Sequence, residues 1–320
     1  MTTNPLPSAL CRAYRRGEVA LIVGAGTSQG CDHLGWHDLS QTVVASVPRP
    51  KRPSLGSIAA SQRLGKPVPH DPGLLHSLKQ KLVAAENELI AMRHVRFDRS
   101  VDLPELVQAV LYSRQHPLSP TVLRIPTLTR VRKICCYNYD DILERAFAQA
   151  GVPHISLFRN QPIPFERSET LIFYPHGYLP DPQHPTLPET PDIVLSEDDY
   201  FSLYSTPYAW ANLVQLTLLQ NYTALFVGCS LTDPNLRRLL QIASSARPDH
   251  RHFAILKLPK SSPKLPRWLA ANELAAYRSV KQQELGTLSV VPVWVAKYQE
   301  IDATLAALCN DALYLPKEEP

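Results

Sequence analysis

Short apolar runs alternate along this chain with segments whose apolar residues recur at helical spacing. Continuous runs such as "VALIV" (19–23) and "TALFV" (223–227) are typical of strands buried on both faces of a parallel sheet. Similar runs occur at "RKICC", "HISLF", "LIFY", "HFAILKL" and "LSVVPVWV". Because helical patterns separate them, the chain is expected to fold as an α/β protein with a parallel sheet, and ligands are expected beyond the carboxyl ends of its strands.

Helix signals support this alternation. A helix is predicted over Ser8–Arg16 with Gly17 as its stop, and another over residues 142–150 with Gly151 as its stop. Further helices are predicted in "WHDLSQTVVASV", "AWANLVQLTLLQN", "LTDPNLRRLLQIA", "ELAAYRSVKQQEL" and "IDATLAALCNDAL". Residues 46–130 differ, because this range is broken by prolines and holds two amphipathic helix candidates, at 74–95 and 103–115. We interpret 46–130 as a mostly helical insertion or cap within a single domain spanning 1–320.

Composition narrows the class of protein. Apolar residues make up 44% and charged residues 19% of the 320 residues, as in ordinary soluble globular proteins. The formal charge of +4 is mild, and "RPKRP" (49–53) is interpreted as a solvated loop, so direct nucleic-acid binding is not indicated. No signal peptide and no apolar stretch of roughly 20 residues is visible, so we expect a cytoplasmic protein without a membrane segment.

The six cysteines form no C-x-x-C pair, which argues against a zinc ribbon or a redox motif. Cys135 and Cys136 lie in an apolar run and are expected to be buried thiols. No metal-ligand set is apparent, and no metal is expected.

The stretch "ALIVGAGTSQG" (20–30) resembles a dinucleotide-binding turn and then departs from it. Gly24 and Gly26 fit the G-x-G-x-x-G fingerprint, but Gln29 occupies the third glycine position. No acidic residue follows at the spacing of roughly 20 positions that the fingerprint requires. Glycines here would let the backbone approach a pyrophosphate, and a purely structural strand-to-helix turn is the alternative.

Three more polar turns follow predicted strands: "YNYDD" (137–141), "PHG" (175–177) and "GCSLTDPN" (228–235). Asn138 can orient a water or a ribose hydroxyl, because an amide both donates and accepts hydrogen bonds. Asp140 or Asp141 can cap the following helix, and for Asp141 we favour capping.

The other two turns carry further candidates. His176, flanked by glycine at the end of an apolar strand, is expected to be exposed at the ligand edge. Gly228 allows close backbone approach, while Ser230 and Asp233 can either bond a ribose or cap the helix that starts near Pro234.

In order, these motifs resemble the SIR2-like family, in the branch found in bacterial anti-phage defence proteins rather than in protein-deacetylating sirtuins. "GAGTS" matches the GAG-x-S loop, "CYNYDDILE" the T-T-N-Y-D-x-x-L-E segment, and "YPHGYLPDP" the H-G segment. "DIVLSEDDY" matches I-V-L-T-E-x-x-Y, and "LFVGCSLTDPNLRRLL" matches F-I-G-x-S-L-x-D-P-N. The resemblance covers 18–45 and 131–310. Cys136 and Tyr137 replace the usual threonine pair before Asn138, which puts the fine shape of the pocket in doubt.

The resemblance implies a Rossmann-like domain, with helices on both faces of its sheet, that cleaves the nicotinamide–ribose bond of NAD⁺. It makes Asn138 and His176 the catalytic pair. Among the NAD-binding positions, it places Ala25 and Ser28 at the phosphate and ribose region, Asp140 at the nicotinamide ribose, and the turn after 227 at the adenosine side. The complete set of expected NAD-binding residues is Gly24, Ala25, Gly26, Ser28, Asp140, Gly228, Ser230 and Asp233.

The expected activity is therefore an NAD⁺ glycohydrolase that releases nicotinamide and ADP-ribose, with NAD⁺ as substrate and no other cofactor. We expect an NAD-depleting effector of anti-phage (abortive infection) defence, gated by homo-oligomerisation or by a regulatory partner protein from the same defence operon. An NAD-dependent protein deacylase is the first alternative. It is disfavoured because such sirtuins usually carry a four-cysteine zinc module, and no cysteine lies between His176 and Gly228. A non-catalytic NAD or ADP-ribose-binding module is the second, and the retained Asn138 and His176 argue against it.

Overall fold

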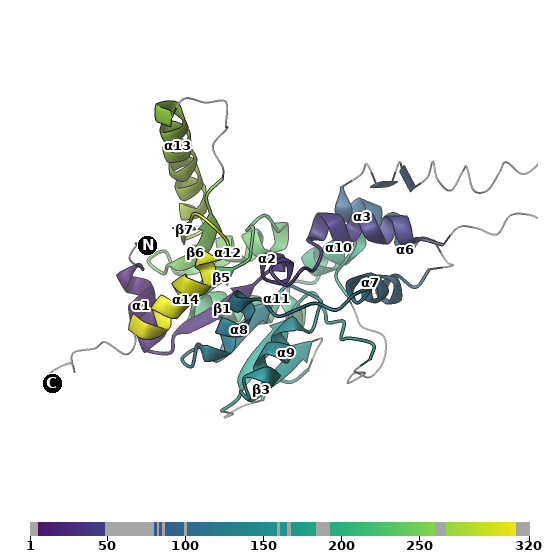
Figure 1. The fold of residues 1–320 in the computed structure, drawn as a ribbon, viewed down its shortest axis with the longest axis horizontal. Helices are drawn as coiled ribbons and strands as arrows, with labels where there is room; N and C mark the ends of the chain where they lie inside the picture. The colour runs from purple at the N-terminus through teal and green to yellow at the C-terminus, as the bar shows by residue number, and fades with distance from the viewer. Residues whose placement is uncertain are drawn as a thin grey trace, which may run out of the picture.

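The computed structural model describes residues 6–48, 80–81, 83–84, 87–98, 101–158, 161–164, 168–183, 193–259 and 267–311. Within these residues one seven-stranded sheet has the order β3-β4-β2-β1-β5-β6-β7, and every pair of neighbouring strands is parallel (Figure 1). Its strands are β1 (Val19–Val23), β2 (Lys133–Cys136), β3 (His154–Phe158), β4 (Thr170–Tyr174), β5 (Thr223–Val227), β6 (His252–Lys257) and β7 (Val290–Val295). The predicted parallel α/β sheet is confirmed, and its first strand lies at the centre, between β2 and β5.

The helices follow the predicted alternation closely. They are α1 (Ser8–Arg15), α2 (Ala25–Gln29), α3 (Trp36–Ser46), α6 (Glu88–Arg96), α7 (Leu103–Leu111), α8 (Pro120–Arg124), the 3₁₀ turn η1 (Ile125–Thr127), α9 (Ile142–Gln149), α10 (Glu197–Ser205), α11 (Trp210–Asn221), α12 (Pro234–Ala246), α13 (Arg267–Gly286) and α14 (Glu300–Asp311). Both predicted glycine stops have left-handed backbone, with φ of 71° at Gly17 and 65° at Gly151. That conformation is readily adopted by glycine and ends each helix.

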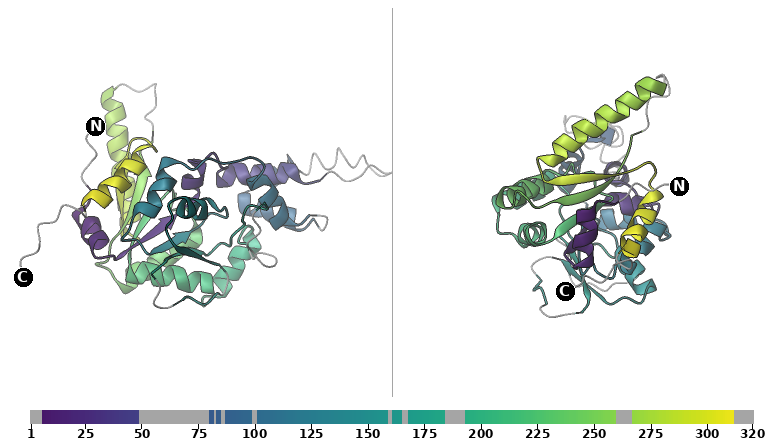
Figure 2. Two further views of the ribbon diagram at one scale, coloured as in Figure 1. Left: turned by 60° about the horizontal axis from the view of Figure 1, so that its bottom comes forward. Right: turned by 90° about the vertical axis from the view of Figure 1, so that its left-hand side faces the viewer.

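Helices cover both faces of the sheet, as Figure 2 shows from two further directions. Alternate residues of each strand face opposite sides: Leu21 and Val23 pack with side chains of α1, α9 and α14, whereas Ala20 and Ile22 pack with side chains of α11 and α12. Strands β1, β4 and β5 are buried along their whole length, whereas the edge strands β3 and β7 are partly exposed. A sheet of this kind leaves only its edges and strand ends for polar chemistry.

A separate apolar cluster lies beside the carboxyl ends of the central strands. Helices α3, α6 and α7 pack on one another around buried side chains such as Met92, and Leu195 joins them from the segment before α10. The prediction of one continuous helix over 74–95 is wrong, because a new helix, α6, begins after Asn87. The Asn87 side chain caps α6 by accepting a hydrogen bond from the Leu89 N–H. The predicted loop "RPKRP" and the first part of that helix lie outside the described residues.

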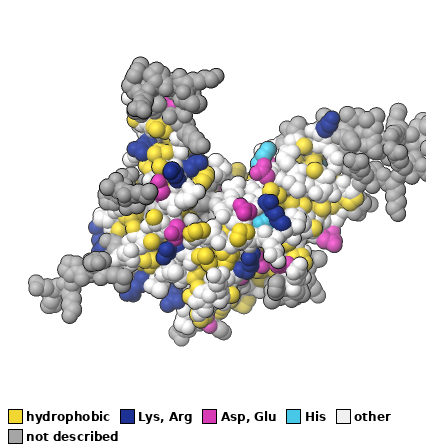
Figure 3. Space-filling model, viewed as in Figure 1, with side chains coloured by type: hydrophobic (Ala, Val, Ile, Leu, Met, Phe, Trp, Pro, Cys, Tyr) yellow, Lys and Arg dark blue, Asp and Glu magenta, His cyan; other side chains and the backbone are white. Residues whose placement is uncertain are grey.

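Other parts of the range 46–130 pack elsewhere. Helix α8 contacts α9 and α14, and Ile125 of η1 enters the core beneath the sheet. Helix α13 projects from the body in Figure 1, with its carboxyl end anchored by the buried Leu285. On the face drawn in Figure 3, Lys and Arg side chains are scattered among Asp and Glu. In the described part of the chain, no helix combines the length and apolar character that a membrane span requires.

Candidate active site at the carboxyl edge of the sheet

The glycine-rich turns after β1 and β5 interlock through their backbones. The Gly24 N–H donates to the carbonyl of Val227 at 3.0 Å, and the Gly26 N–H donates to the carbonyl of Gly228 at 2.9 Å. Gly228 has φ of 68°, and a Cβ on it would lie 2.6 Å from the Thr27 nitrogen. A Cβ on Gly24 would lie 2.8 Å from Cys229 Sγ. These glycines are therefore required for the two turns to fit together.

Asn138 follows β2 and is fixed by the first glycine-rich turn. Its Nδ2 donates to the Gly24 carbonyl at 3.2 Å, to Thr27 Oγ1 at 3.2 Å and to Ser28 Oγ at 2.7 Å. The carbonyl of Gly24 is an acceptor only, which establishes that the amide nitrogen faces this turn. Asn138 is buried, and its Oδ1 has no hydrogen-bond partner within the described part of the chain. A buried oxygen without a partner is costly, so this atom is available to a donor on a ligand or a water.

The side chain that caps α9 is that of Asp140 and not that of Asp141. The Ile142 N–H at the start of α9 is bonded by Asp140 Oδ1 at 3.3 Å, whereas Asp141 makes no side-chain capping bond. The capping role predicted for Asp141 is therefore wrong, because the neighbouring carboxylate occupies that N–H. Desolvation raises the pKa of Asp140 to about 6, although its hydrogen bond to Ser28 lowers it. A buried carboxylate linked to the glycine-rich turn is typical of a functional site.

His176 lies at the end of β4 and is buried, with only 6% of its surface exposed, rather than exposed as expected. Two tyrosine rings cover it: the centroid of Tyr137 lies 4.8 Å away at an interplanar angle of 75°, and that of Tyr200 lies 6.0 Å away at 68°. Desolvation lowers the pKa of His176, while the nearby Asp233 raises it. Its Nε2 is buried, and no described residue forms a hydrogen bond with it. The imidazole is therefore held neutral and can accept a proton.

In the turn after β5, Ser230 and Asp233 were each expected either to bond a ribose or to cap α12, and the structure distinguishes these roles for Asp233. Asp233 Oδ1 accepts the Leu236 N–H at 2.6 Å and so caps α12, while Oδ2 accepts the hydroxyl of Tyr200. Ser230 is exposed, and its Oγ lies 2.6 Å from Thr232 Oγ1. Capping is therefore what the structure shows for Asp233, and the Ser230 hydroxyl is accessible from solvent.

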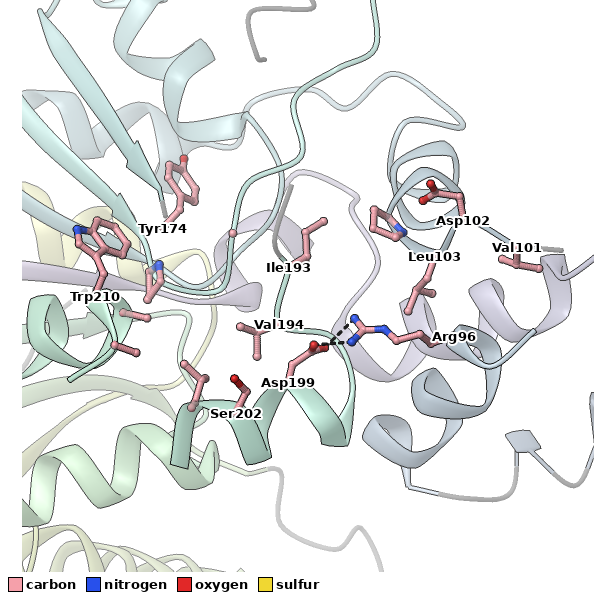
Figure 4. A pocket seen from close by; sticks show the side chains of 16 residues that line it. Arg96, Val101, Asp102, Leu103, Tyr174, Ile193, Val194, Asp199, Ser202 and Trp210 are labelled. Carbon is pink, nitrogen blue, oxygen red and sulfur yellow. Dashed lines mark hydrogen bonds and ion pairs between the residues drawn. The ribbon is translucent and has the colours of Figure 1, made fainter. Parts of the chain in front are cut away.

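A cavity of about 680 Å³ opens beside His176, between β4, α7, α10 and α11. Pro175 and Gly177, the neighbours of His176, line it, but the glycine-rich turns do not. Figure 4 shows Arg96 and Asp199 meeting across the cavity, with Tyr174 and Trp210 at one end and Asp102 and Leu103 at the other. The structure thus places Asn138 with Gly24 and Ser28, and His176 at the border of the cavity.

Sequence reasoning missed Tyr137, Tyr200 and Arg96. Tyr137 was visible as a departure from the family motif, and Tyr200 closes the matched segment "DIVLSEDDY" to which no role was assigned. Arg96 carries no sequence signal, because its partner Asp199 is more than 100 residues away. Among the described residues, no group of three or more His, Cys, Asp or Glu side chains is arranged to hold a metal ion.

The chain also matches known proteins in sequence. Residues 132–277 match the family model of the SIR2-like domain. The chain is also 23% identical over 328 residues to the NAD(+) hydrolase ThsA of Bacillus cereus (strain MSX-D12), a match that covers 97% of this chain. It spans 59% of the length of that relative. The matched segment contains β2 to β6 with Asn138, His176 and the turn after β5, so this part of the chain is similar to the SIR2-like domain.

Proposed function

We propose that this protein is an NAD⁺ glycohydrolase that cleaves the nicotinamide–ribose bond to give nicotinamide and ADP-ribose. The observation that carries the proposal is a pair of buried polar atoms, Asn138 Oδ1 and His176 Nε2, for which the described residues provide no hydrogen-bond partner. They follow neighbouring strands, β2 and β4, at the edge of the sheet where ligands bind in parallel α/β folds. The relative described above, named as an NAD⁺ hydrolase, supports the same activity.

Each part of the site has a role in this reaction. The backbone from Gly24 to Gly26 contacts the pyrophosphate. Gly24 and Gly26 themselves are required because a Cβ on either would collide with the turn after β5. Ala25 and Ser28 border the phosphate and ribose region, and Asp140 bonds the nicotinamide ribose. Gly228 and Ser230 hold the adenosine side, and Asp233 caps α12 beside them.

The chemistry requires only these residues and water. The glycosidic bond breaks with its electron pair going to the nicotinamide nitrogen, which becomes neutral, while positive charge develops on the ribose as in other glycosyl transfers. Asn138 Oδ1 accepts a hydrogen bond from the attacking water and orients it. His176 accepts the proton that the water loses on bonding to the ribose carbon. In this proposal NAD⁺ is the substrate, and neither a metal nor a second cofactor takes part.

The biological part of the proposal rests on the resemblance to anti-phage SIR2-like proteins. The protein acts in the cytoplasm as an effector that depletes NAD⁺, and its activity is gated by homo-oligomerisation or by a partner protein from the same operon. Constant hydrolysis would remove the NAD⁺ of the host cell, so an ungated enzyme would be toxic.

Nicotinamide release from NAD⁺ by the purified protein, at several protein concentrations and with the products of neighbouring genes, tests the activity. Asn138→Ala and His176→Ala are expected to lower the rate by about 100-fold or more. The exposed residues Asn221 and His37 provide matched controls, Asn221→Ala and His37→Ala, which should retain the wild-type rate. Equal rates in all four variants would refute the site. ADP-ribose binding without any release, in every condition, would refute the enzyme and favour a binding module.

A further inference from the structure

Helix α10 starts with a dense set of hydrogen bonds around Asp199. Its Oδ2 accepts from the Leu195 N–H at 2.9 Å, the Ser196 N–H at 2.8 Å and Ser196 Oγ at 2.9 Å, which forms a capping box. This is the segment "DIVLSEDDY", whose match to the family carried no assigned role. The first turn of α10 is thus fixed to the chain that precedes it.

Helix α6 forms ion pairs with the first turn of α10. The Arg96 guanidinium contacts both carboxylate oxygens of Asp199, at 2.5 Å and 2.8 Å. Arg93 lies 2.9 Å from Glu197 and 3.2 Å from Asp198. A planar guanidinium bonded to two oxygens sets direction as well as distance, so α6 fixes the orientation of α10.

Tyr200, the next residue of α10, connects this helix to the candidate active site. The ring contacts the His176 imidazole, and the hydroxyl donates to Asp233 Oδ2 at the start of α12. Tyr137 contacts the same imidazole, and its own hydroxyl donates to Gln215 of α11. Each of the two rings in contact with His176 is therefore anchored at its far end by a hydrogen bond to another helix.

His176 needs such support because its Nε2 has no hydrogen bond among the described residues. Among the described residues, the ring contacts of this imidazole are those with Tyr137 and Tyr200, and they restrict the direction of that nitrogen. We propose that Tyr200 is a positioning residue for His176, and that its bond to Asp233 keeps both the ring and the nearby carboxylate in place. The proposal rests on the proposed function only for its effect on the rate, because the placement of the imidazole is a property of the protein alone.

The groups that face His176 predict how its titration responds. They are the hydroxyl-bearing rings of Tyr137 and Tyr200 and the carboxylate of Asp233. The Tyr200 hydroxyl donates to that carboxylate and partly neutralises it. Removing the hydroxyl leaves more negative charge near the imidazole, and this stabilises the imidazolium. The pH at which His176 is half protonated should therefore rise in Tyr200→Phe.

The test compares Tyr200→Phe with Tyr208→Phe, the same substitution at a side chain that is 83% exposed. We expect Tyr200→Phe to lower kcat for NAD⁺ by about tenfold, with KM changed less than about twofold, because a misplaced proton acceptor slows the reaction without loosening the dinucleotide. Tyr208→Phe should match the wild type. Tyr200→Leu, which also removes the ring, should lower kcat further. A thermal unfolding transition shows whether this variant has folded.

Nitrogen-edited NMR titration of His176, assigned by the signal missing in His176→Gln, gives a readout that needs no turnover. A midpoint raised by half a pH unit or more in Tyr200→Phe, but not in Tyr208→Phe, supports the positioning role even if the wild type releases no nicotinamide. Identical midpoints in the two variants overturn it, whatever the wild-type activity. An inactive wild type with a shifted Tyr200→Phe midpoint contradicts the proposed function alone.

Discussion

The two sides of the candidate site are held together by different forces. The turns after β1 and β5 meet through backbone hydrogen bonds and close steric fit, with Gly24 and Gly228 at the contact. The opposite side, where α10 meets α6, is joined by ion pairs between partly exposed side chains, such as Arg96 and Asp199. The first side has no room for one additional methyl group, whereas the second depends on charge.

This difference extends to buried charge. On the first side the Asp140 carboxylate lacks a cationic partner among the bonds found for it, and its burial raises its pKa to about 6. On the second side the Asp199 carboxylate has the guanidinium of Arg96. Neutralising a carboxylate should therefore raise stability at the first side and lower it at the second.

The largest effect is expected from Gly228→Ala. The added Cβ would collide with the Thr27 nitrogen at 2.6 Å, in a left-handed backbone with φ of 68°. The free energy of unfolding should fall by about 3 kcal/mol, through overpacking added to backbone strain. Urea unfolding measures it.

Gly151→Ala separates the two causes. Gly151 has φ of 65°, but a Cβ there would meet nothing within 4 Å. The free energy of unfolding of this variant should therefore fall by only about 1 kcal/mol. Equal losses at the two glycines would mean that strain alone acts and that the turns after β1 and β5 are not tightly fitted.

Asp140→Asn should have the next largest effect, with a sign that depends on pH. Because the folded-state pKa is raised from 3.8 to about 6, the wild type has its full stability below pH 3.8 and loses stability as pH rises through 6. The asparagine variant lacks this loss. It should be close to the wild type near pH 4 and more stable by about 2 kcal/mol at pH 8.

Unfolding at the two pH values, with Asp249→Asn as the exposed control, gives this measurement. A stability difference that does not change with pH would contradict the assignment of Asp140 as a buried, desolvated carboxylate. Higher stability together with slower NAD⁺ hydrolysis would indicate that the charge is retained for function at a cost in stability.

The smallest effect is expected from Arg96→Gln. Its side chain is 34% exposed and that of Asp199 is 19% exposed, so solvent weakens this ion pair. The free energy of unfolding should fall by about 1 kcal/mol at low salt. Raising the NaCl concentration should shrink the difference from the wild type, because mobile ions screen partly exposed charges. Arg16→Gln, at a pair whose side chains are 65% and 50% exposed, is the control and should be neutral. Stabilisation by Arg96→Gln at pH 8 would remove the contrast between the two sides.

Much of the fold was predictable, because local patterns decide it. Continuous apolar runs gave the strands, and Gly17 and Gly151 ended their helices as expected. The order of the strands was not predictable, since it depends on pairings between distant residues. The prediction of one helix over 74–95 was wrong at Asn87. Apolar residues at helical spacing lie on both sides of this position, but its side chain caps a new helix there.

The site was predictable to the level of its motifs and not of its contacts. The sequence predicted Asn138 and His176 at strand ends. The burial of His176, however, depends on Tyr200, which lies on a helix about 24 residues further along the chain. The choice between Asp140 and Asp141 as cap also depends on three-dimensional detail, because the two carboxylates are adjacent and only one reaches the Ile142 N–H.

The interlocked turns also have a consequence for the order in which the protein assembles. Strand β1 is the first of the sheet in the chain, yet Val19 pairs with Thr223 and Val23 with Val227, partners about 200 residues away. The turn that begins at Gly24 reaches its final shape only when the carbonyl of Gly228 arrives. Contacts of such long sequence separation are costly to form early and slow folding. During synthesis the central strand therefore waits for the second half of the chain, and a nascent protein has no complete candidate site until β5 has joined β1.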